Sequence, residues 1–196
     1  MKFKEIKEHL SRYTVGIAGA GGLGSNCAVA LARSGIGRLI IADFDIVEES
    51  NLNRQYFFTS QTGMKKTEAL KANIAKINPC THVETHDTML NEKNIISLFK
   101  ECHIIVEAFD SSDMKELIAH TVMEGLPDKV LVMGSGLAGF GNNNGIRERK
   151  IDDRLYICGD GQSETGIDNP PLAPRVGIVA NMQANIVVEL LMKEKK

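Results

Sequence analysis

The sequence lacks tryptophan, and aromatic residues make up only 5% of its 196 residues. A buried core must therefore be built from Ile, Val, Leu and Ala, which favours buried parallel strands packed by helices. The 18 glycines are too many for a helical bundle, because glycine destabilises helix interiors. These features predict an α/β fold. Because a domain usually has about 100–200 residues, we expect one domain over residues 1–196.

The sequence also lacks a large net charge and long apolar runs. Its 23 Lys and Arg and 25 Asp and Glu leave a net charge of −2, whereas nucleic-acid-binding domains normally carry a basic excess. No stretch reaches the roughly 20 apolar residues of a membrane span. Residues 1–10 are rich in Lys and Glu and lack the apolar centre of a signal peptide. We therefore expect a cytoplasmic protein that binds neither nucleic acid nor membrane.

The four cysteines stand alone, without any Cys-x-x-Cys pair. Structural zinc sites normally use such closely spaced ligands, so we expect no structural zinc. Cys27 falls in a predicted helix and Cys102 next to a predicted strand, which makes both of them core thiols.

Strands alternate with helices along most of the chain, which predicts a mostly parallel, Rossmann-like sheet with helices on both faces. The expected parallel strands are residues 13–18, 38–42, 82–86, 104–108 and 130–133. The expected helices are residues 2–11, 25–34, 64–77, 91–100 (capped by Asn91), 113–124 and 176–193. An antiparallel hairpin is expected from residues 146–149 and 154–158, followed by a Gly- and Pro-containing loop at 159–174.

A Gly-x-Gly-x-x-Gly motif lies between the first strand and the next helix. Gly19, Gly21, Gly22 and Gly24 allow a tight turn and a close approach of backbone amides to phosphate at a helix N-terminus. Asp43 follows Gly24 by 19 residues, at the end of the next strand, where a carboxylate binds ribose hydroxyls. The motif predicts an adenine nucleotide, without distinguishing NAD from ATP.

Charged segments further along the chain favour a triphosphate over a dinucleotide. Hydride transfer needs no such set of charged residues. An enzyme that binds a triphosphate needs Arg and Lys to neutralise the phosphate oxygens and an Asp to hold Mg²⁺. The segments are DFD at 43–45, NLNRQ at 51–55, GMKKTEAL at 63–70 and the strand end at Asp110.

With GAGGLGS at 19–25 and APRV…MQAN at 173–185, these segments make the chain resemble the E1-like (ThiF–MoeB) family of adenylyltransferases over nearly its whole length. The resemblance implies ATP-dependent adenylylation of the C-terminal glycine of a ubiquitin-fold sulfur carrier ending in Gly-Gly. It is closest to the ThiF branch, which serves thiamine biosynthesis. It also implies ATP and Mg²⁺ as cofactors and a homodimer, with the hairpin and loop 159–174 receiving the carrier's tail.

Matched by position, the resemblance implies roles for individual residues. The implied catalytic residues are Arg54, Lys66 and Asp110, of which Asp110 also binds Mg²⁺. The implied nucleotide-binding residues are Gly19, Gly21, Gly22, Gly24, Asp43, Asp45, Asn51 and Gln55.

Other interpretations remain open. Arg54 could be a surface arginine that pairs with Glu48 or Glu49, and Asp110 could cap the helix that follows it. Lys66 could be a solvated helix residue, or Lys65 could take its role. The whole chain could also be an NAD-dependent oxidoreductase or a non-catalytic module that binds a nucleotide or a carrier.

The chain departs from the resemblance at three points. The Cys-x-x-Cys pairs of many relatives are missing. The arginine that many relatives insert into the partner subunit's site has no clear counterpart, although Arg175 could substitute for it. Cys158 could bond covalently to the carrier, but a buried, inert thiol is the preferred interpretation.

Overall fold

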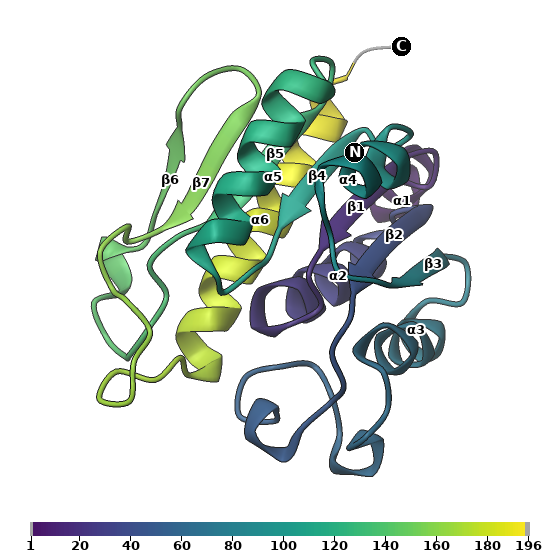
Figure 1. The fold of residues 1–196 in the computed structure, drawn as a ribbon. Helices are drawn as coiled ribbons and strands as arrows, with labels where there is room; N and C mark the ends of the chain where they lie inside the picture. The colour runs from purple at the N-terminus through teal and green to yellow at the C-terminus, as the bar shows by residue number, and fades with distance from the viewer. Residues whose placement is uncertain (1, 195–196) are drawn as a thin grey trace.

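The computed structural model describes residues 2–194, so residues 1, 195 and 196 of the expected domain lie outside the described part. Its strands form a seven-stranded sheet in the order β3-β2-β1-β4-β5-β7-β6 (Figure 1). The strands are β1 (Thr14–Ala18), β2 (Arg38–Asp43), β3 (His82–Asp87), β4 (Ile104–Glu107), β5 (Val130–Gly134), β6 (Arg147–Lys150) and β7 (Leu155–Gly159). All neighbouring strands are parallel except β6 and β7. The predicted Rossmann-like sheet is confirmed.

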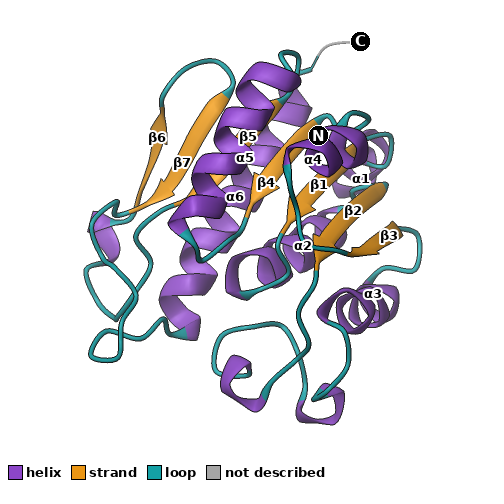
Figure 2. Cartoon of the chain, in the orientation of Figure 1, coloured by secondary structure: helices purple, strands orange, loops and turns teal. Residues whose placement is uncertain are grey.

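Helices cover both faces of the sheet (Figure 2). One buried cluster contains residues of α2, α3 and α6, while α4 and α5 belong to a second cluster on the other face. The helices are α1 (Phe3–Leu10), α2 (Gly22–Ser34), α3 (Lys66–Ile77), α4 (Glu92–Phe99), α5 (Ser112–Gly125) and α6 (Ala173–Lys193). Three short 3₁₀ helices occupy the loops: η1 (Glu49–Asn51), η2 (Thr59–Gln61) and η3 (Asn143–Gly145).

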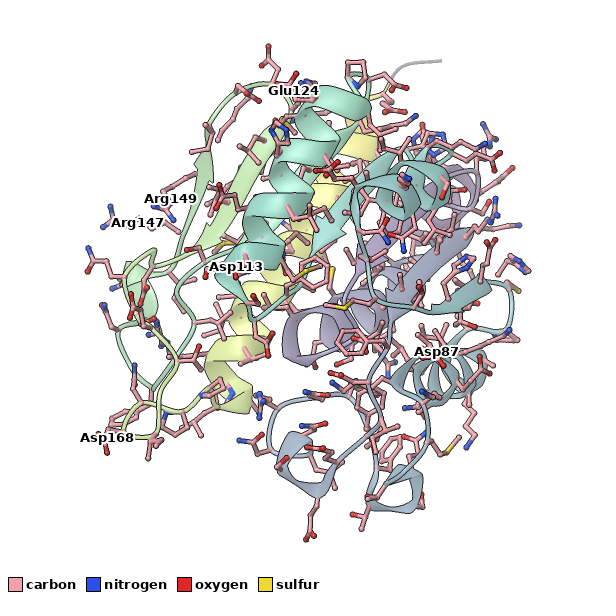
Figure 3. All side chains as sticks on the ribbon, in the orientation of Figure 1. Asp87, Asp113, Glu124, Arg147, Arg149 and Asp168 are labelled. Atoms are coloured by element: carbon pink, nitrogen blue, oxygen red, sulfur yellow. The ribbon has the colours of Figure 1, made fainter. Side chains whose placement is uncertain are left out.

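The antiparallel hairpin of β6 and β7 is confirmed, and its second strand also extends the parallel sheet. Leu155 pairs with Leu131 and Cys158 with Gly134, in a parallel register. All four residues of β6 are exposed, and Arg147 and Arg149 lie along this strand in Figure 3. The hairpin therefore forms one edge of the sheet.

Three helix starts differ from the sequence-based expectation by two or three residues. Helix α2 begins at Gly22, inside the glycine motif, where the sequence predicted a start at residue 25. Helix α3 begins at Lys66 instead of residue 64. Helix α6 begins at Ala173, inside the expected loop 159–174, instead of residue 176. The expected cap of α4 is confirmed, since Asn91 accepts a hydrogen bond from the Asn94 amide at 3.1 Å.

Helix α6 is long and apolar enough to cross a membrane by length and composition alone, contrary to the expectation that no stretch is. A buried core helix meets the same criterion. Here Val179, Val187 and Leu191 are fully buried in the core cluster shared with α2, although Ile178 is 37% exposed. Packing in the core accounts for the apolar composition.

Candidate nucleotide-binding site

The glycine loop joins the carboxyl end of β1 to the N-terminus of α2. Gly19 adopts a φ of +97°, which favours glycine. A Cβ on Gly24 would lie 1.8 Å from the Gly19 carbonyl oxygen, so only glycine fits there. Helix α2 starts from Gly21 without a side-chain cap, which leaves backbone N–H groups and the positive end of the helix dipole facing the loop. This arrangement suits a phosphate group.

Asp43, at the end of β2, fixes the loop from the neighbouring strand. Its carboxylate accepts hydrogen bonds from the Ala20 amide at 2.6 Å and the Asp45 amide at 2.8 Å. One side chain thus holds both the glycine loop and the segment that leaves β2. The structure brings Asp43 beside the loop as the sequence predicted, while its contact with ribose stays a prediction.

The structure separates Lys66 from its neighbour Lys65. Lys66 is buried, and its Nζ lies 2.7 Å from the Asp45 carboxylate. Lys65 is half exposed and pairs with Asp87 at 3.2 Å, beside α3 (Figure 3). The interpretation of Lys66 as a solvated helix residue is therefore wrong, and Lys66 rather than Lys65 is connected through Asp45 and Asp43 to the glycine loop.

The segment that carries Arg54 packs on the first turn of α2. The side-chain amide of Asn26 donates to the carbonyl oxygens of Gly22 at 2.7 Å and Arg54 at 2.9 Å. These two bonds connect the Arg54 segment to α2. A Cβ on Gly22 would lie 3.6 Å from Arg54 Cγ, so the arginine stem runs along the glycine loop. Its guanidinium contacts Asn53 and the Ser50 carbonyl instead of the acids that the sequence offered as partners.

Gln55 and Asn51 belong to the same segment. Gln55 is buried, and its Nε2 would lie 3.8 Å from a Cβ on Gly21. Its Oε1 is buried without a hydrogen-bond partner among the described residues. Asn51 is half-buried and bonds locally to the Glu48 amide at 3.1 Å. Gln55 therefore faces the loop directly, whereas Asn51 supports the turn.

Asp110 lies in an exposed turn after β4. Residue Ser111 precedes α5 as its N-cap, without a side-chain cap bond, so Asp110 does not cap this helix. The turn contacts the glycine loop, because a Cβ on Gly19 would lie 2.9 Å from the Ala108 carbonyl oxygen and 3.4 Å from the Phe109 ring. Phe109, the residue before Asp110, therefore lies against the glycine loop.

Sequence reasoning missed several residues that hold the site together. The Ser25 hydroxyl donates to the Gly21 carbonyl at 2.6 Å and accepts from the Tyr56 amide at 2.9 Å. Glu107, at the end of β4, is fully buried and paired with Lys115. An acid at the end of an apolar strand was the available signal for Glu107.

Arg175 is not available to a second subunit. Its side chain is 4% exposed, and its guanidinium donates to the Asp160 carboxylate and to the Gly141 carbonyl, each at 2.6 Å. Burial by itself would raise the pKa of Asp160, but the amides of Ser163 and Gln162, together with Arg175, lower it. Because this pair fastens the loops around Gly141 and Asp160 to the start of α6, Arg175 is a buried residue with an internal partner, and its expected role in a second subunit's site is wrong.

The cysteines of the core are inert by burial. Burial raises the pKa of Cys158 to about 12, and it also raises the pKa of Cys102 to about 12. Cys27 is likewise buried, with a raised pKa. The interpretation of Cys158 as a buried thiol is confirmed, because a nucleophilic cysteine needs an accessible thiolate.

The described residues hold no group of three or more His, Cys, Asp or Glu side chains that could bind a metal ion by themselves. Mg²⁺ at nucleotide sites is usually held by one or two carboxylates together with phosphate oxygens. The exposed Asp110 carboxylate, which forms no hydrogen bond or ion pair within residues 2–194, fits that single-carboxylate arrangement.

Comparison with known proteins places the chain in a family. The ThiF family model matches residues 3–196. The chain is 32% identical over 200 residues to the adenylyltransferase and sulfurtransferase MOCS3 of Dictyostelium discoideum, covering 95% of this chain and 45% of that protein. It is 28% identical to a probable molybdopterin-synthase adenylyltransferase of Porphyra purpurea, covering 97% and 51%. The chain thus spans about half the length of these relatives.

Solved structures agree on the fold. The Escherichia coli tRNA N6-threonylcarbamoyladenosine dehydratase TcdA, in complex with ATP, superposes with a TM-score of 0.86 at 19% identity, covering 96% of this chain and 89% of that one. From the match over residues 3–196, the chain belongs to the ThiF family.

Proposed function

We propose that the protein is an adenylyltransferase that uses ATP to activate the C-terminal glycine of a ubiquitin-fold sulfur carrier ending in Gly-Gly. The observation that carries the proposal is that three elements connect to one glycine loop. The buried Lys66 does so through Asp45 and Asp43, the side chain of Arg54 lies against Gly22, and the turn before Asp110 lies against Gly19. Membership of the ThiF family and the adenylyltransferase names of the relatives support it.

The chemistry fits the residues present. A terminal carboxylate is already ionised at neutral pH, so it needs no general base. One of its oxygens attacks the α-phosphorus of ATP, the bond from that phosphorus to the bridging oxygen breaks, and pyrophosphate leaves. The barrier lies in bringing an anion onto a polyanion, which fixed cations and alignment lower.

Each residue has a part in this step. The amides of the glycine loop and the N-terminus of α2 bind phosphate, and Asp43 binds ribose. Lys66 and Arg54 neutralise phosphate oxygens, and the planar guanidinium can contact two of them at once. Asp110 would hold Mg²⁺, which supplies positive charge to the phosphates when bound.

The finer assignments are also proposals. We propose a ThiS-like carrier of thiamine biosynthesis, which the sequence resemblance supports, while neither of the two relatives above is named for thiamine biosynthesis. A homodimer, a single adenylation domain over residues 1–196 and a cytoplasmic location complete the proposal.

Carrier-dependent exchange of labelled pyrophosphate into ATP tests the function, with each candidate Gly-Gly carrier assayed in turn and NADH absorbance followed in parallel. Exchange that requires the carrier's terminal glycine supports the proposal. Hydride turnover without exchange would establish an oxidoreductase instead. ATP binding without either reaction would establish a non-catalytic binding module.

A further inference from the structure

The end of β4 carries a carboxylate that is wholly enclosed by protein. Glu107 is 0% exposed, and both of its oxygens contact the Lys115 ammonium, at 2.7 and 2.9 Å. Lys115 comes from the first part of α5 and also donates to the Gly134 carbonyl at 2.8 Å. The pair therefore connects the ends of β4 and β5 to the start of α5.

The same carboxylate holds the backbone of the turn that follows it. One oxygen accepts a hydrogen bond from the Phe109 amide at 2.6 Å, and the other accepts from the Gly134 amide at 3.3 Å. The Glu107 carbonyl in turn accepts from the buried Gln183 side chain at 2.9 Å. Hydrogen bonds thus hold Glu107 and Phe109 from several sides, whereas Asp110, which follows Phe109, is exposed.

We propose that Glu107 and Lys115 are positioning residues, which hold Asp110 where it meets the metal-bound phosphates of the nucleotide. The inference rests on the proposed function. The pair acts through the Phe109 amide, one residue before Asp110, and through the Ala108 carbonyl, which lies against Gly19 of the glycine loop.

Stability alone is a poor reason for such a pair. Enclosing two charges is costly, and apolar residues of similar volume often serve a core equally well. Burial raises the pKa of Glu107 despite its contact with Lys115, which reflects this cost. The two carboxylate oxygens of Glu107 accept hydrogen bonds from the backbone N–H groups of Phe109 and Gly134, and these bonds set the shape of the turn. An apolar side chain would supply no such acceptors.

The Glu107→Gln substitution isolates this role. Glutamine has nearly the same volume, but it must turn its amide NH₂ toward one of the two backbone N–H groups, which frees that side of the turn. Binding of a fluorescent N-methylanthraniloyl ATP is measured in Mg²⁺ and in EDTA, with thermal unfolding as the test of folding. We expect a folded variant whose affinity in EDTA matches that of the unmodified protein, while the additional affinity in Mg²⁺ is lost.

Pyrophosphate exchange should fall by ~10-fold or more in the same variant, since small displacements of aligned groups cost up to about 100-fold in rate. The double variant Glu107→Gln/Lys115→Met, which removes both charges at similar volume, should give the same result. The matched control is Arg38→Met/Glu84→Gln, a neutralised ion pair between β2 and β3 that should leave Mg²⁺-dependent binding unchanged.

A folded Glu107→Gln protein that keeps its full Mg²⁺-dependent affinity would overturn the inference. So would failure of both variants to fold, because the pair would then serve the fold itself. If the unmodified protein shows no exchange with any carrier, the proposed adenylylation fails, while the ATP-binding experiment still decides the role of the pair.

Discussion

The ammonium group of Lys66 lies 2.7 Å from the Asp45 carboxylate, although only 7% of the lysine side chain is exposed. Asp45 is held in turn through its amide by Asp43, which also binds the Ala20 amide of the glycine loop. The Lys66 charge therefore has one half-exposed acid as its partner, on a segment that Asp43 connects to the glycine loop. A nucleotide phosphate could replace that acid.

Substitution of the two adjacent lysines should separate their roles. Lys66→Met should lower carrier-dependent pyrophosphate exchange by ~100-fold or more, the scale of one preorganised charge partner. Lys65→Met, which removes only the partly exposed pair with Asp87 at 3.2 Å, should stay within about threefold of the unmodified rate. Equal losses in the two variants would contradict the assignment of Lys66.

Arg54→Ala and Asp110→Ala should each lower exchange by at least ~100-fold. Asp110→Ala should do so with little change in the melting temperature, because the side chain is exposed. The measurement is exchange at saturating carrier, with circular dichroism to verify the fold. Near-normal exchange in both folded variants would refute their proposed roles.

Gly24→Ala should destabilise the protein by roughly 1–3 kcal/mol and abolish nucleotide binding, since the added carbon would lie 1.8 Å from the Gly19 carbonyl oxygen. Gly21→Ala is the matched control within the same loop. The nearest heavy atom to its added carbon is Gln55 Nε2 at 3.8 Å, so its melting temperature should change much less. A denaturant titration of both variants makes the comparison.

Alkaline pH should destabilise the protein through its buried thiols. The pKa of Cys158 and of Cys102 is about 12 in the fold, against an ordinary value of 9.0. The unfolded chain therefore loses these protons first, and the free energy of unfolding falls as pH rises from about 9 toward 12. Denaturant titrations at successive pH values check this, and Cys158→Ala should make the decline shallower.

Arg175→Met should cost about 3–5 kcal/mol of stability, because it leaves the largely buried Asp160 carboxylate without its ion-pair partner. Asp160→Asn together with Arg175→Met should recover part of that loss. If Arg175 instead served a second subunit, the single variant would lose exchange at an unchanged melting temperature.

Local signals predicted most of the fold. Alternating apolar runs and glycine positions located β1, α2 and β2, because strand and helix periodicity are properties of neighbouring residues. The glycine motif and Asp43 likewise predicted a loop and a carboxylate that the structure places in contact. The exact start of α2 was missed, because glycine and serine are weak helix formers and the helix forms there through packing against the Arg54 segment.

The sequence by itself determined the order of strands and helices, the glycine loop and the residue types near it. Only the tertiary structure decided which charges pair. Lys66 pairs with Asp45, which is 21 residues away in the sequence, Lys115 pairs with Glu107, and Arg175 pairs with Asp160. Such partners depend on which strand ends and helix starts meet across the sheet, and on burial that excludes water from the pair. Neither is encoded in the spacing of neighbouring residues.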